Sequence, residues 1–232
     1  MIFLIIIIIS LLLLMIYFFI DNRKEYFDIS KIDINDFDYK TKKYNPQNYK
    51  QIIYTIILKK AKTALDRLNI PFFLSSGTLL GYYRENKFID HDYDIDIGIY
   101  AEDYRDQIIS EMKKEGLIYY RTLGDPINGM EMSFRLPYTR LGRLAKLDLF
   151  LHYQSNDKIY WFAFAQWRKN KKIKYQINNF QLKEINFMNL NVNVPYPTEK
   201  YLEEHYGKDW RIPKKPFKEY SFFKSPISIV NN

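Results

Sequence analysis

Cysteine is absent from all 232 residues of this chain, and the sequence also lacks any Asn-x-Ser/Thr sequon. Without cysteine the chain forms no disulfide and offers no thiolate to a metal. Without a sequon it has no acceptor for N-linked glycosylation. These absences exclude a disulfide-stapled domain and a zinc-thiolate centre, and both are compatible with either side of a membrane.

Charge is missing from the first 20 residues, MIFLIIIIISLLLLMIYFFI, which also contain no proline. About 20 apolar residues are enough to cross a bilayer as a helix. A cleaved signal peptide has a shorter apolar region and a small-residue cleavage site, which the following DNRKEYFDIS does not offer. We therefore expect an uncleaved transmembrane signal-anchor at residues 1–20. Arg23 and Lys24 favour a cytosolic body only weakly, because long domains cross regardless of charge.

Residues 21–45 are polar without a clear period, and we expect them to form a stalk that leads into a catalytic domain at residues 46–232. Every charged residue follows the anchor, so the remainder of the chain carries the full formal net charge of +8. A basic body favours anionic partners such as nucleotides, phosphorylated glycans, a lipid surface or nucleic acid. An ordinary basic surface accounts for the same charge equally well.

Helical and strand-like patterns alternate along the body, which is typical of an α/β or α+β domain. Helices are predicted at 48–69, in GTLLGYYREN, at 102–115 and at about 198–206. Strands are predicted at 72–76, 93–99, 117–123, 130–136 and 145–151. The stretch 159–194 is interpreted as irregular strands interrupted by WRKNKKIKY, which is expected to be a solvated loop or a lipid-facing patch.

The segment IDHDYDIDIGIY, residues 89–100, alternates aspartate with isoleucine. Because successive side chains of a strand point to opposite faces, this spacing separates an apolar from an acidic face. The apolar face would comprise Tyr93, Ile95, Ile97 and Ile99, and the acidic face Asp92, Asp94 and Asp96. Like charges about 7 Å apart along a strand repel one another. A shared Mg²⁺ or Mn²⁺, which prefers oxygen ligands, would offset that repulsion.

The acidic pattern also has to be compared with an EF-hand loop and with a solvated acidic loop. An EF-hand loop counted from Asp92 needs glycine at its sixth position and glutamate at its twelfth, but the chain has Ile97 and Asp103 there. A solvated acidic loop rarely alternates so regularly with isoleucine. We therefore favour a strand whose carboxylates bind a metal.

A third carboxylate for such a site is offered by Asp148 in AKLDLFL, where an unpaired charge among apolar residues would be costly. If this strand neighbours 93–99, Asp148 can face the same ion. Alternatively, Asp148 is a buried carboxylate whose hydrogen bonds are satisfied by backbone amides.

The segment SSGTLLG, residues 75–81, predicts a strand, a turn and the start of a helix. Gly77 lets a phosphate approach the backbone, a helix N-terminus favours anions, and the hydroxyls of Ser76 and Thr78 add donors. Alone, such a turn is equally an ordinary helix cap. Followed by the aspartate strand, it indicates a metal-dependent phosphoryl or nucleotidyl transferase. A glycosyltransferase with an Asp-x-Asp pair, or a non-catalytic membrane-anchored scaffold, are the rival interpretations.

Four stretches together resemble the LicD/fukutin family of phosphotransferases over residues 70–217. They are FFLSSGTLLGYYRENKFIDHDYDIDIGIY, MEMSFRL, AKLDLF and YLEEHYGKDWRIPKKPF, in family order. The resemblance implies a nucleotidyltransferase-like mixed sheet flanked by helices. It implies a CDP-linked alcohol donor whose ribitol 5-phosphate or phosphocholine group passes to a hydroxyl of a glycan or glycoprotein acceptor with release of CMP. No nucleic-acid partner is implied, and relatives act in the lumen of the secretory pathway, of the ER/Golgi type.

The resemblance also assigns roles by position. Asp94, Asp96 and Asp148 are implied as ligands of Mg²⁺ or Mn²⁺ and as catalytic residues, with Asp148 placed to help deprotonate the acceptor. The implied substrate-binding residues are Ser76, Gly77 and Thr78 in the phosphate turn, Arg84 beside the donor diphosphate, and Glu131, whose role the pattern leaves open. The roles of His91 and Asp92 are likewise left open.

Overall fold

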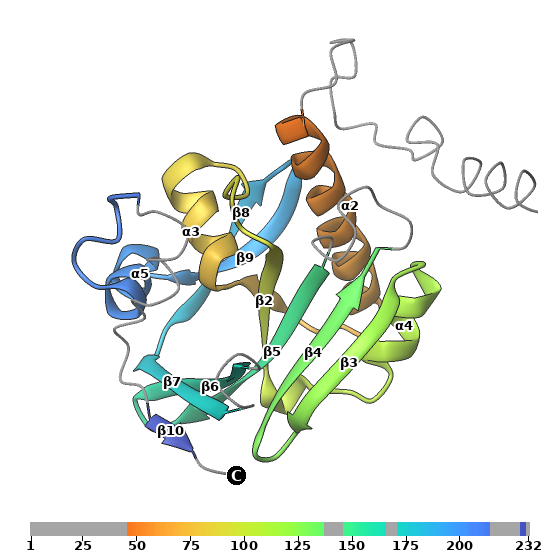
Figure 1. The fold of residues 1–232 in the computed structure, drawn as a ribbon. Coiled ribbons are helices and arrows are strands. Elements are labelled where there is room, and N and C mark those ends of the chain that lie inside the picture. Colours follow the sequence, from red (N-terminus) through yellow and green to blue (C-terminus); the bar gives the residue numbers. More distant parts are fainter. Residues whose placement is uncertain (1–45, 137–145, 166–170, 214–227, 231–232) are drawn as a thin grey trace, which may run out of the picture.

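The structure is a computed structural model that describes residues 46–136, 146–165, 171–213 and 228–230 (Figure 1). The predicted anchor at 1–20 and the predicted stalk at 21–45 lie outside the described residues. Among the helices that the structure describes, none is long and apolar enough to cross a bilayer.

Helices and strands alternate through the first half of the domain, and strands dominate the second half. The helices are α2 (Pro46–Arg67), α3 (Ser76–Glu85), α4 (Ile108–Lys114) and α5 (Thr198–Tyr206). The strands are β1 (Phe72–Leu74), β2 (Asp94–Tyr100), β3 (Ile118–Asp125), β4 (Gly129–Arg135), β5 (Lys146–Ser155), β6 (Lys158–Ala165), β7 (Lys171–Asn178), β8 (Gln181–Phe187), β9 (Leu190–Tyr196) and β10 (Ser228–Val230). This mixed α+β arrangement confirms the predicted fold class for the described residues.

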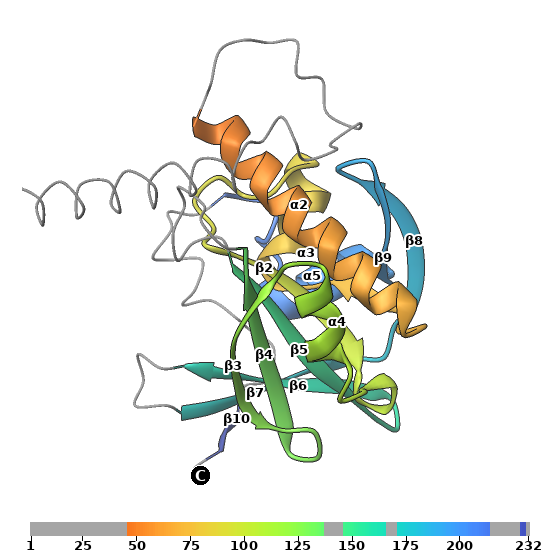
Figure 2. The ribbon, with the colours of Figure 1, turned by 90° about the vertical axis from the view of Figure 1, so that its right-hand side faces the viewer.

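The described strands form one ten-stranded mixed sheet. Its main path runs β10-β7-β6-β5-β2-β1-β9-β8, and β4 joins at β5 with β3 beyond it. Strands β2 and β5 pair in parallel near the centre, whereas β1 pairs with β2 in antiparallel fashion. Figure 2 shows α2 and α4 side by side, with α2 packed against β5 and α4 against β3.

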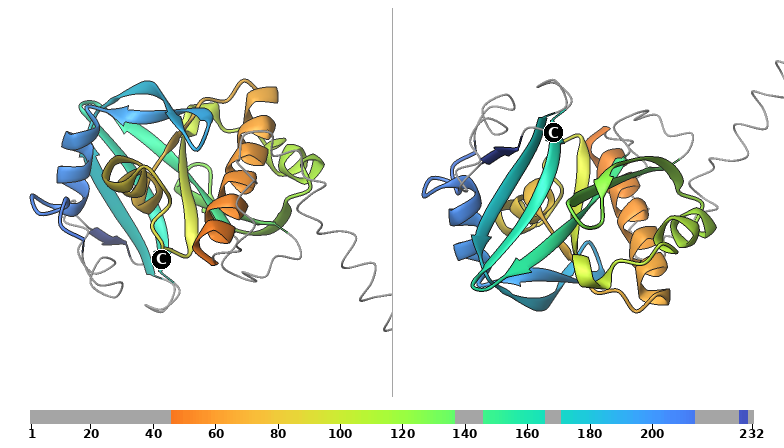
Figure 3. Two further views of the ribbon diagram at one scale, coloured as in Figure 1. Left: turned by 90° about the horizontal axis from the view of Figure 1, so that it is seen from above. Right: turned by 90° about the horizontal axis from the view of Figure 1, so that it is seen from below.

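The core lies between the central strands and α2. The odd-numbered isoleucines of β2, Ile95, Ile97 and Ile99, are fully buried, as the alternation predicts. Residues Leu147, Leu149 and Leu151 of β5 are buried beside them. Each such side chain stabilises the fold by roughly 1.5–3 kcal/mol relative to exposure. Because this face is apolar, the even-numbered residues of β2 must point to the opposite face. Figure 3 shows α5 and α2 at opposite sides of the domain.

Three sequence-based predictions were wrong in detail. Tyr93 precedes β2 and is 51% exposed, so it does not join the apolar face. The predicted helix at 102–115 divides into a short 3-10 turn at Ala101–Asp103 and α4, because the backbone of Tyr104 is extended between them. Residues 171–175 of WRKNKKIKY belong to β7, where Ile173 and Tyr175 are buried, and are therefore not a solvated loop, whereas residues 167–170 lie outside the described residues.

Candidate active site

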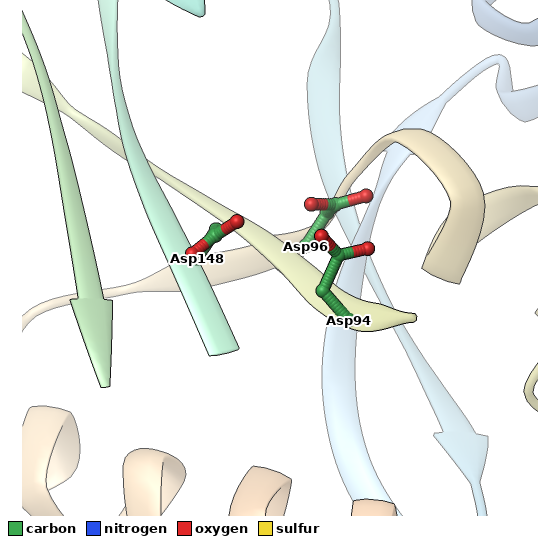
Figure 4. A group of neighbouring side chains, drawn as sticks. All are labelled: Asp94, Asp96 and Asp148. Atoms are coloured by element: carbon green, nitrogen blue, oxygen red, sulfur yellow. The ribbon is translucent and has the colours of Figure 1, made fainter. Parts of the chain in front are cut away.

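The register of β2 against β5 brings the three predicted carboxylates together. Asp96 lies opposite Asp148 in the parallel pair of strands. Asp94 precedes Asp96 by two residues and therefore points to the same face of the sheet. One oxygen from each of Asp94, Asp96 and Asp148 lies within 4.8 Å of the other two (Figure 4). The expectation that the strand of Asp148 neighbours the strand of the other two is therefore confirmed.

Close approach of three carboxylates is electrostatically unfavourable, and this is reflected in their pKa values. Burial raises the pKa of Asp96 well above its usual range, and the charge of Asp94 adds to the rise. Burial also raises the pKa of Asp94, followed in importance by the charge of Asp92. The pKa of Asp148 is raised by burial against the opposing effect of Lys146. The cluster is therefore poised to gain stability from a cation.

Two neighbours hold Asp148 in place. The Ser133 hydroxyl on β4 donates a hydrogen bond to Asp148 Oδ1 over 2.6 Å. This partner is a side chain, whereas the alternative interpretation of Asp148 expected backbone amides. The Lys146 ammonium on β5 lies 2.5 Å from Asp148 Oδ2 and 3.1 Å from Asp94 Oδ2. Sequence reasoning missed both residues, although Lys146 stands two positions before Asp148, on the same face of the strand.

The arrangement suits a hard divalent cation. It offers only carboxylate oxygens, which Mg²⁺ prefers, and these come from two rigid neighbouring strands. The Lys146 ammonium bound to two of the three carboxylates demonstrates that this position already accommodates positive charge. The fit is therefore supported by the donor atoms and by a positively charged stand-in.

The predicted phosphate turn lies directly beside Asp96. The first residue of α3, Ser76, has a left-handed backbone with φ of 43°, which is uncommon outside glycine. The Gly77 amide donates to Asp96 Oδ2 over 3.3 Å, and the Asp96 amide donates to Thr78 Oγ1 over 2.9 Å. In addition, the Ser75 amide donates to the Asp96 carbonyl over 3.1 Å. The N-terminus of α3 is thus fixed to the strand that carries two of the carboxylates.

Asp92 lies before β2 and not within it, but its carboxylate is close to the acidic face, because after burial its charge, and also a side-chain hydrogen bond, raise the pKa of Asp94. Asp92 Oδ1 accepts a hydrogen bond from the Tyr93 amide, and Asp92 Oδ2 packs against Gly77. A Cβ atom on Gly77 would stand 2.1 Å from that oxygen. Asp92 is 7% exposed and therefore fills the space that a side chain at position 77 would need.

Arg84 and Glu131 contact other groups than the three carboxylates in the hydrogen bonds and ion pairs described for them. Arg84 is in the last turn of α3, about 12 Å along the helix axis from Ser76, and its guanidinium contacts Glu85. Glu131 is on β4, two residues before Ser133 and on the same face of the strand. Its carboxylate contacts Arg121 and accepts a hydrogen bond from the Phe164 amide. Burial, and secondarily the charge of Asp148, raises the pKa of Glu131 to about 7. Substrate-binding roles for these two residues stay predictions.

The loop before β2 is anchored by the first turns of α2, a feature that sequence reasoning missed. The Lys50 ammonium donates to the carbonyls of Ile89, Asp90 and Asp92, with 2.9 Å to each of the first two. Gln51 exchanges two hydrogen bonds with the backbone of Phe88, of 2.8 and 2.9 Å. These contacts join segments about 40 residues apart in sequence, and the loop leads directly into Asp94.

Removing the ammonium by Lys50→Met is expected to weaken Mn²⁺ binding about five- to tenfold, because the loop before Asp94 loses three hydrogen bonds. Lys60→Met is the matched control, since Lys60 on the same helix donates to the Glu115 carbonyl over 2.6 Å, away from the carboxylates. Lys60→Met should lose less thermal stability than Lys50→Met in a melting experiment, because it removes one hydrogen bond and not three. Equal Mn²⁺ affinities in calorimetry would show that Lys50 does not position the site.

The mixed sheet carries three carboxylates on two adjacent strands next to the N-terminus of a helix, which is the layout expected of a metal-dependent phosphoryl or nucleotidyl transferase. The family model described as "LicD/FKTN/FKRP, nucleotidyltransferase domain" matches residues 69–197, which is more than half of the chain. The chain belongs to this family.

Curated relatives agree with this membership. The ribitol-5-phosphate transferases FKTN of Homo sapiens and Mus musculus are each 35% identical over 176 residues, which is 76% of this chain and 36% of each relative. The chain thus spans about a third of the length of those relatives. An uncharacterised protein of Rickettsia typhi is 27% identical over 194 residues, covering 83% of this chain and 55% of that protein.

Two solved structures were found as distant structural neighbours. The antibiotic-resistance factor ANT(2'')-Ia has a TM-score of 0.46 at 14% identity, covering 74% of this chain and 80% of that chain. The lincosamide adenylyltransferase LnuA has a TM-score of 0.36 at 13% identity, covering 63% and 82%. Likeness at this level does not bear on function.

Proposed function

We propose that this protein is a metal-dependent phosphotransferase that moves a phospho-alcohol from a CDP-linked donor to a glycan hydroxyl and releases CMP. The group transferred is of the ribitol 5-phosphate or phosphocholine type. The ion is Mg²⁺ or Mn²⁺, and its ligands are Asp94, Asp96 and Asp148. The observation that carries the proposal is the convergence of these three carboxylates beside the N-terminus of α3 in a member of the LicD/FKTN/FKRP family.

When bound, the divalent cation supplies charge that neutralises the donor's diphosphate during transfer. The chain's own residues provide the positioning. Asp94 and Asp96 hold the donor side of the site, since Asp96 is bonded to the first turn of α3. The turn of Ser76, Gly77 and Thr78 is the proposed place for the donor's phosphate, because the N-terminus of a helix favours negative charge. The Gly77 amide and the Thr78 hydroxyl also bond to Asp96, which fixes the turn beside the proposed metal ligands.

The acceptor hydroxyl is assigned to the side of Asp148. Its Oδ1 is occupied by the Ser133 hydroxyl, which fixes the orientation of the carboxylate. A fixed carboxylate with a raised pKa accepts a proton more readily than an exposed one. The acceptor oxygen then forms a bond to the phosphorus that bears the alcohol, the bond from that phosphorus to the bridging oxygen breaks, and CMP leaves with the electron pair. In-line positioning and charge stabilisation supply most of the acceleration.

The apolar residues 1–20 are proposed as the membrane anchor of this enzyme, with the catalytic domain on the lumenal side of a secretory membrane. The absence of charge in the segment supports the anchor, and the lumenal side is what the resemblance to the family implies. Protease protection of the catalytic domain in sealed microsomes tests the side of the membrane directly.

The activity is tested with the full chain in detergent micelles. CDP-ribitol, CDP-choline and CDP-glycerol are each supplied with Mg²⁺ or Mn²⁺ and a panel of glycan acceptors, and CMP is measured. We expect CMP from at least one donor and none in EDTA. Donor binding by calorimetry provides a readout that needs no acceptor. Release of UDP or GDP from nucleotide-sugars, with no metal-dependent binding of any CDP-alcohol, would contradict the proposal and favour a glycosyltransferase.

A further inference from the structure

Lys146 occupies a particular position in the carboxylate cluster. Its ammonium bridges Asp94 Oδ2 at 3.1 Å and Asp148 Oδ2 at 2.5 Å, so it contacts one carboxylate on each of the two central strands. The register places Lys146, the first residue of β5, directly opposite Asp94, the first residue of β2. Its side chain is 18% exposed, so the ammonium lies between the interior and solvent.

The charge balance of the cluster explains why an ammonium lies here. Three carboxylates within 4.8 Å of one another carry three negative charges when ionised, and Lys146 supplies the single positive charge between two of them. The repulsion among partly buried like charges is large in a medium of low dielectric. The ammonium therefore holds Asp94 and Asp148 together in the folded chain.

A divalent cation and the ammonium compete where they need the same oxygens. Ligand oxygens lie about 2.1 Å from Mg²⁺, so an ion bound to Asp94 Oδ2 and Asp148 Oδ2 would displace the hydrogen bonds of Lys146 to these two atoms. Two cations that share the same oxygens repel each other strongly. The Lys146 ammonium can move away from the carboxylates readily, because a flexible four-carbon chain joins it to the backbone.

We propose that Lys146 is an exchangeable cation: it holds Asp94 and Asp148 together until a divalent metal displaces it, and it then turns to the donor's diphosphate. This inference rests on the metal-dependent function proposed above. It predicts that metal entry precedes productive donor binding, since the ammonium becomes available for phosphate only after the exchange. The Lys146 ammonium thus neutralises the carboxylates of Asp94 and Asp148 before metal binds and the donor's diphosphate afterwards.

The variant Lys146→Met keeps an unbranched side chain that is one heavy atom shorter and removes its charge. Without the competing ammonium, the full-length variant should bind Mn²⁺ about tenfold more tightly than the wild type in calorimetry. Its melting temperature in EDTA should fall, because the carboxylates lose their counter-ion, and saturating Mn²⁺ should raise it by more than in the wild type. With metal saturating, the dissociation constant of the CDP-alcohol donor should rise, because its phosphate loses a partner.

Lys158→Met is the matched control. Lys158 is also a strand lysine with a polar partner, Asn178 Oδ1 at 2.5 Å, but it lies on β6 and outside the carboxylate cluster. It should leave the Mn²⁺ affinity and the donor affinity unchanged. If Lys146→Met does not fold in EDTA, recovery of its melting transition on addition of Mn²⁺ supports the exchange, and no recovery at any Mn²⁺ concentration overturns it.

The failure of this inference differs from the failure of the proposed function. If the wild type binds Mn²⁺ and Lys146→Met binds it with equal or lower affinity, the exchange is wrong and the metal-dependent function stands. If the wild type binds no Mn²⁺ and no metal-dependent donor, the metal-dependent function fails together with the inference.

Discussion

Replacing Asp96 by asparagine is expected to abolish turnover while raising the melting temperature of the protein in EDTA. Activity should fall by about three orders of magnitude or more, because an amide is a poor ligand for a hard cation and the transition-state charge is no longer neutralised. Stability should rise by about 1 kcal/mol, because one of three mutually repelling carboxylates becomes neutral. The amide oxygen can still accept the Gly77 hydrogen bond, so the turn at α3 should persist.

The opposite signs of these two effects separate a ligand from a structural residue. A merely structural aspartate would lose stability and activity together. Asp157→Asn is the control, since Asp157 is a strongly exposed carboxylate next to Lys158, and it should change neither quantity. Turnover of Asp96→Asn within tenfold of the wild type, measured as CMP release, would remove Asp96 from the proposed ligand set.

Replacing Gly77 by alanine is expected to reduce turnover by about 10- to 100-fold, because displacement of reacting groups by about 1 Å is costly to catalysis. The added Cβ would stand 2.1 Å from Asp92 Oδ2, so the carboxylate or the start of α3 must move. Asp92 is nearly fully buried and bonded to the Tyr93 amide, which limits its ability to give way. CMP release and the melting temperature are measured together.

A double-mutant cycle identifies the cause of the Gly77→Ala defect. In the background of Asp92→Ala the clash is removed, so adding Gly77→Ala should cost much less than it does in the wild type. Gly81→Ala is a second comparison on the same helix, because its Cβ would meet the Lys87 carbonyl at 2.5 Å, away from the phosphate turn. It should lower stability but leave the activity of the folded protein unchanged. Additive effects in the cycle would show that the clash with Asp92 is not responsible.

Much of the site could be predicted from the sequence because its determinants are local. The alternation in β2 separates isoleucines from aspartates by strand geometry alone, and the burial of Ile95, Ile97 and Ile99 follows it. Helix α5 occupies the predicted residues 198–206, ended by a glycine with φ of 91°. The neighbouring position of Asp148 could be argued because an isolated carboxylate in an apolar strand needs a partner.

The remaining parts depend on pairings between segments that are distant in sequence. Lys146 reaches Asp94 only because β5 pairs with β2 in a register that sets the two residues opposite each other, and no local pattern specifies that register. Likewise, the contacts of Lys50 reach about 40 residues along the chain. The lysine-rich start of β7 was not recognised as a strand because its charges suggested solvent. In the structure the Lys172 ammonium lies 4.1 Å from the centre of the Phe162 ring, and the Lys174 ammonium lies 4.0 Å from the centre of the Tyr160 ring.

The most direct test of the account is the location of a bound metal by anomalous diffraction from crystals of the protein grown with Mn²⁺. We predict one strong peak between the ends of β2 and β5, about 2 Å from an oxygen of each of Asp94, Asp96 and Asp148, with the Lys146 ammonium turned away from Asp94 and Asp148. The absence of an anomalous peak at these carboxylates at saturating Mn²⁺, with or without a peak elsewhere, would contradict the assignment of this cluster as the metal centre.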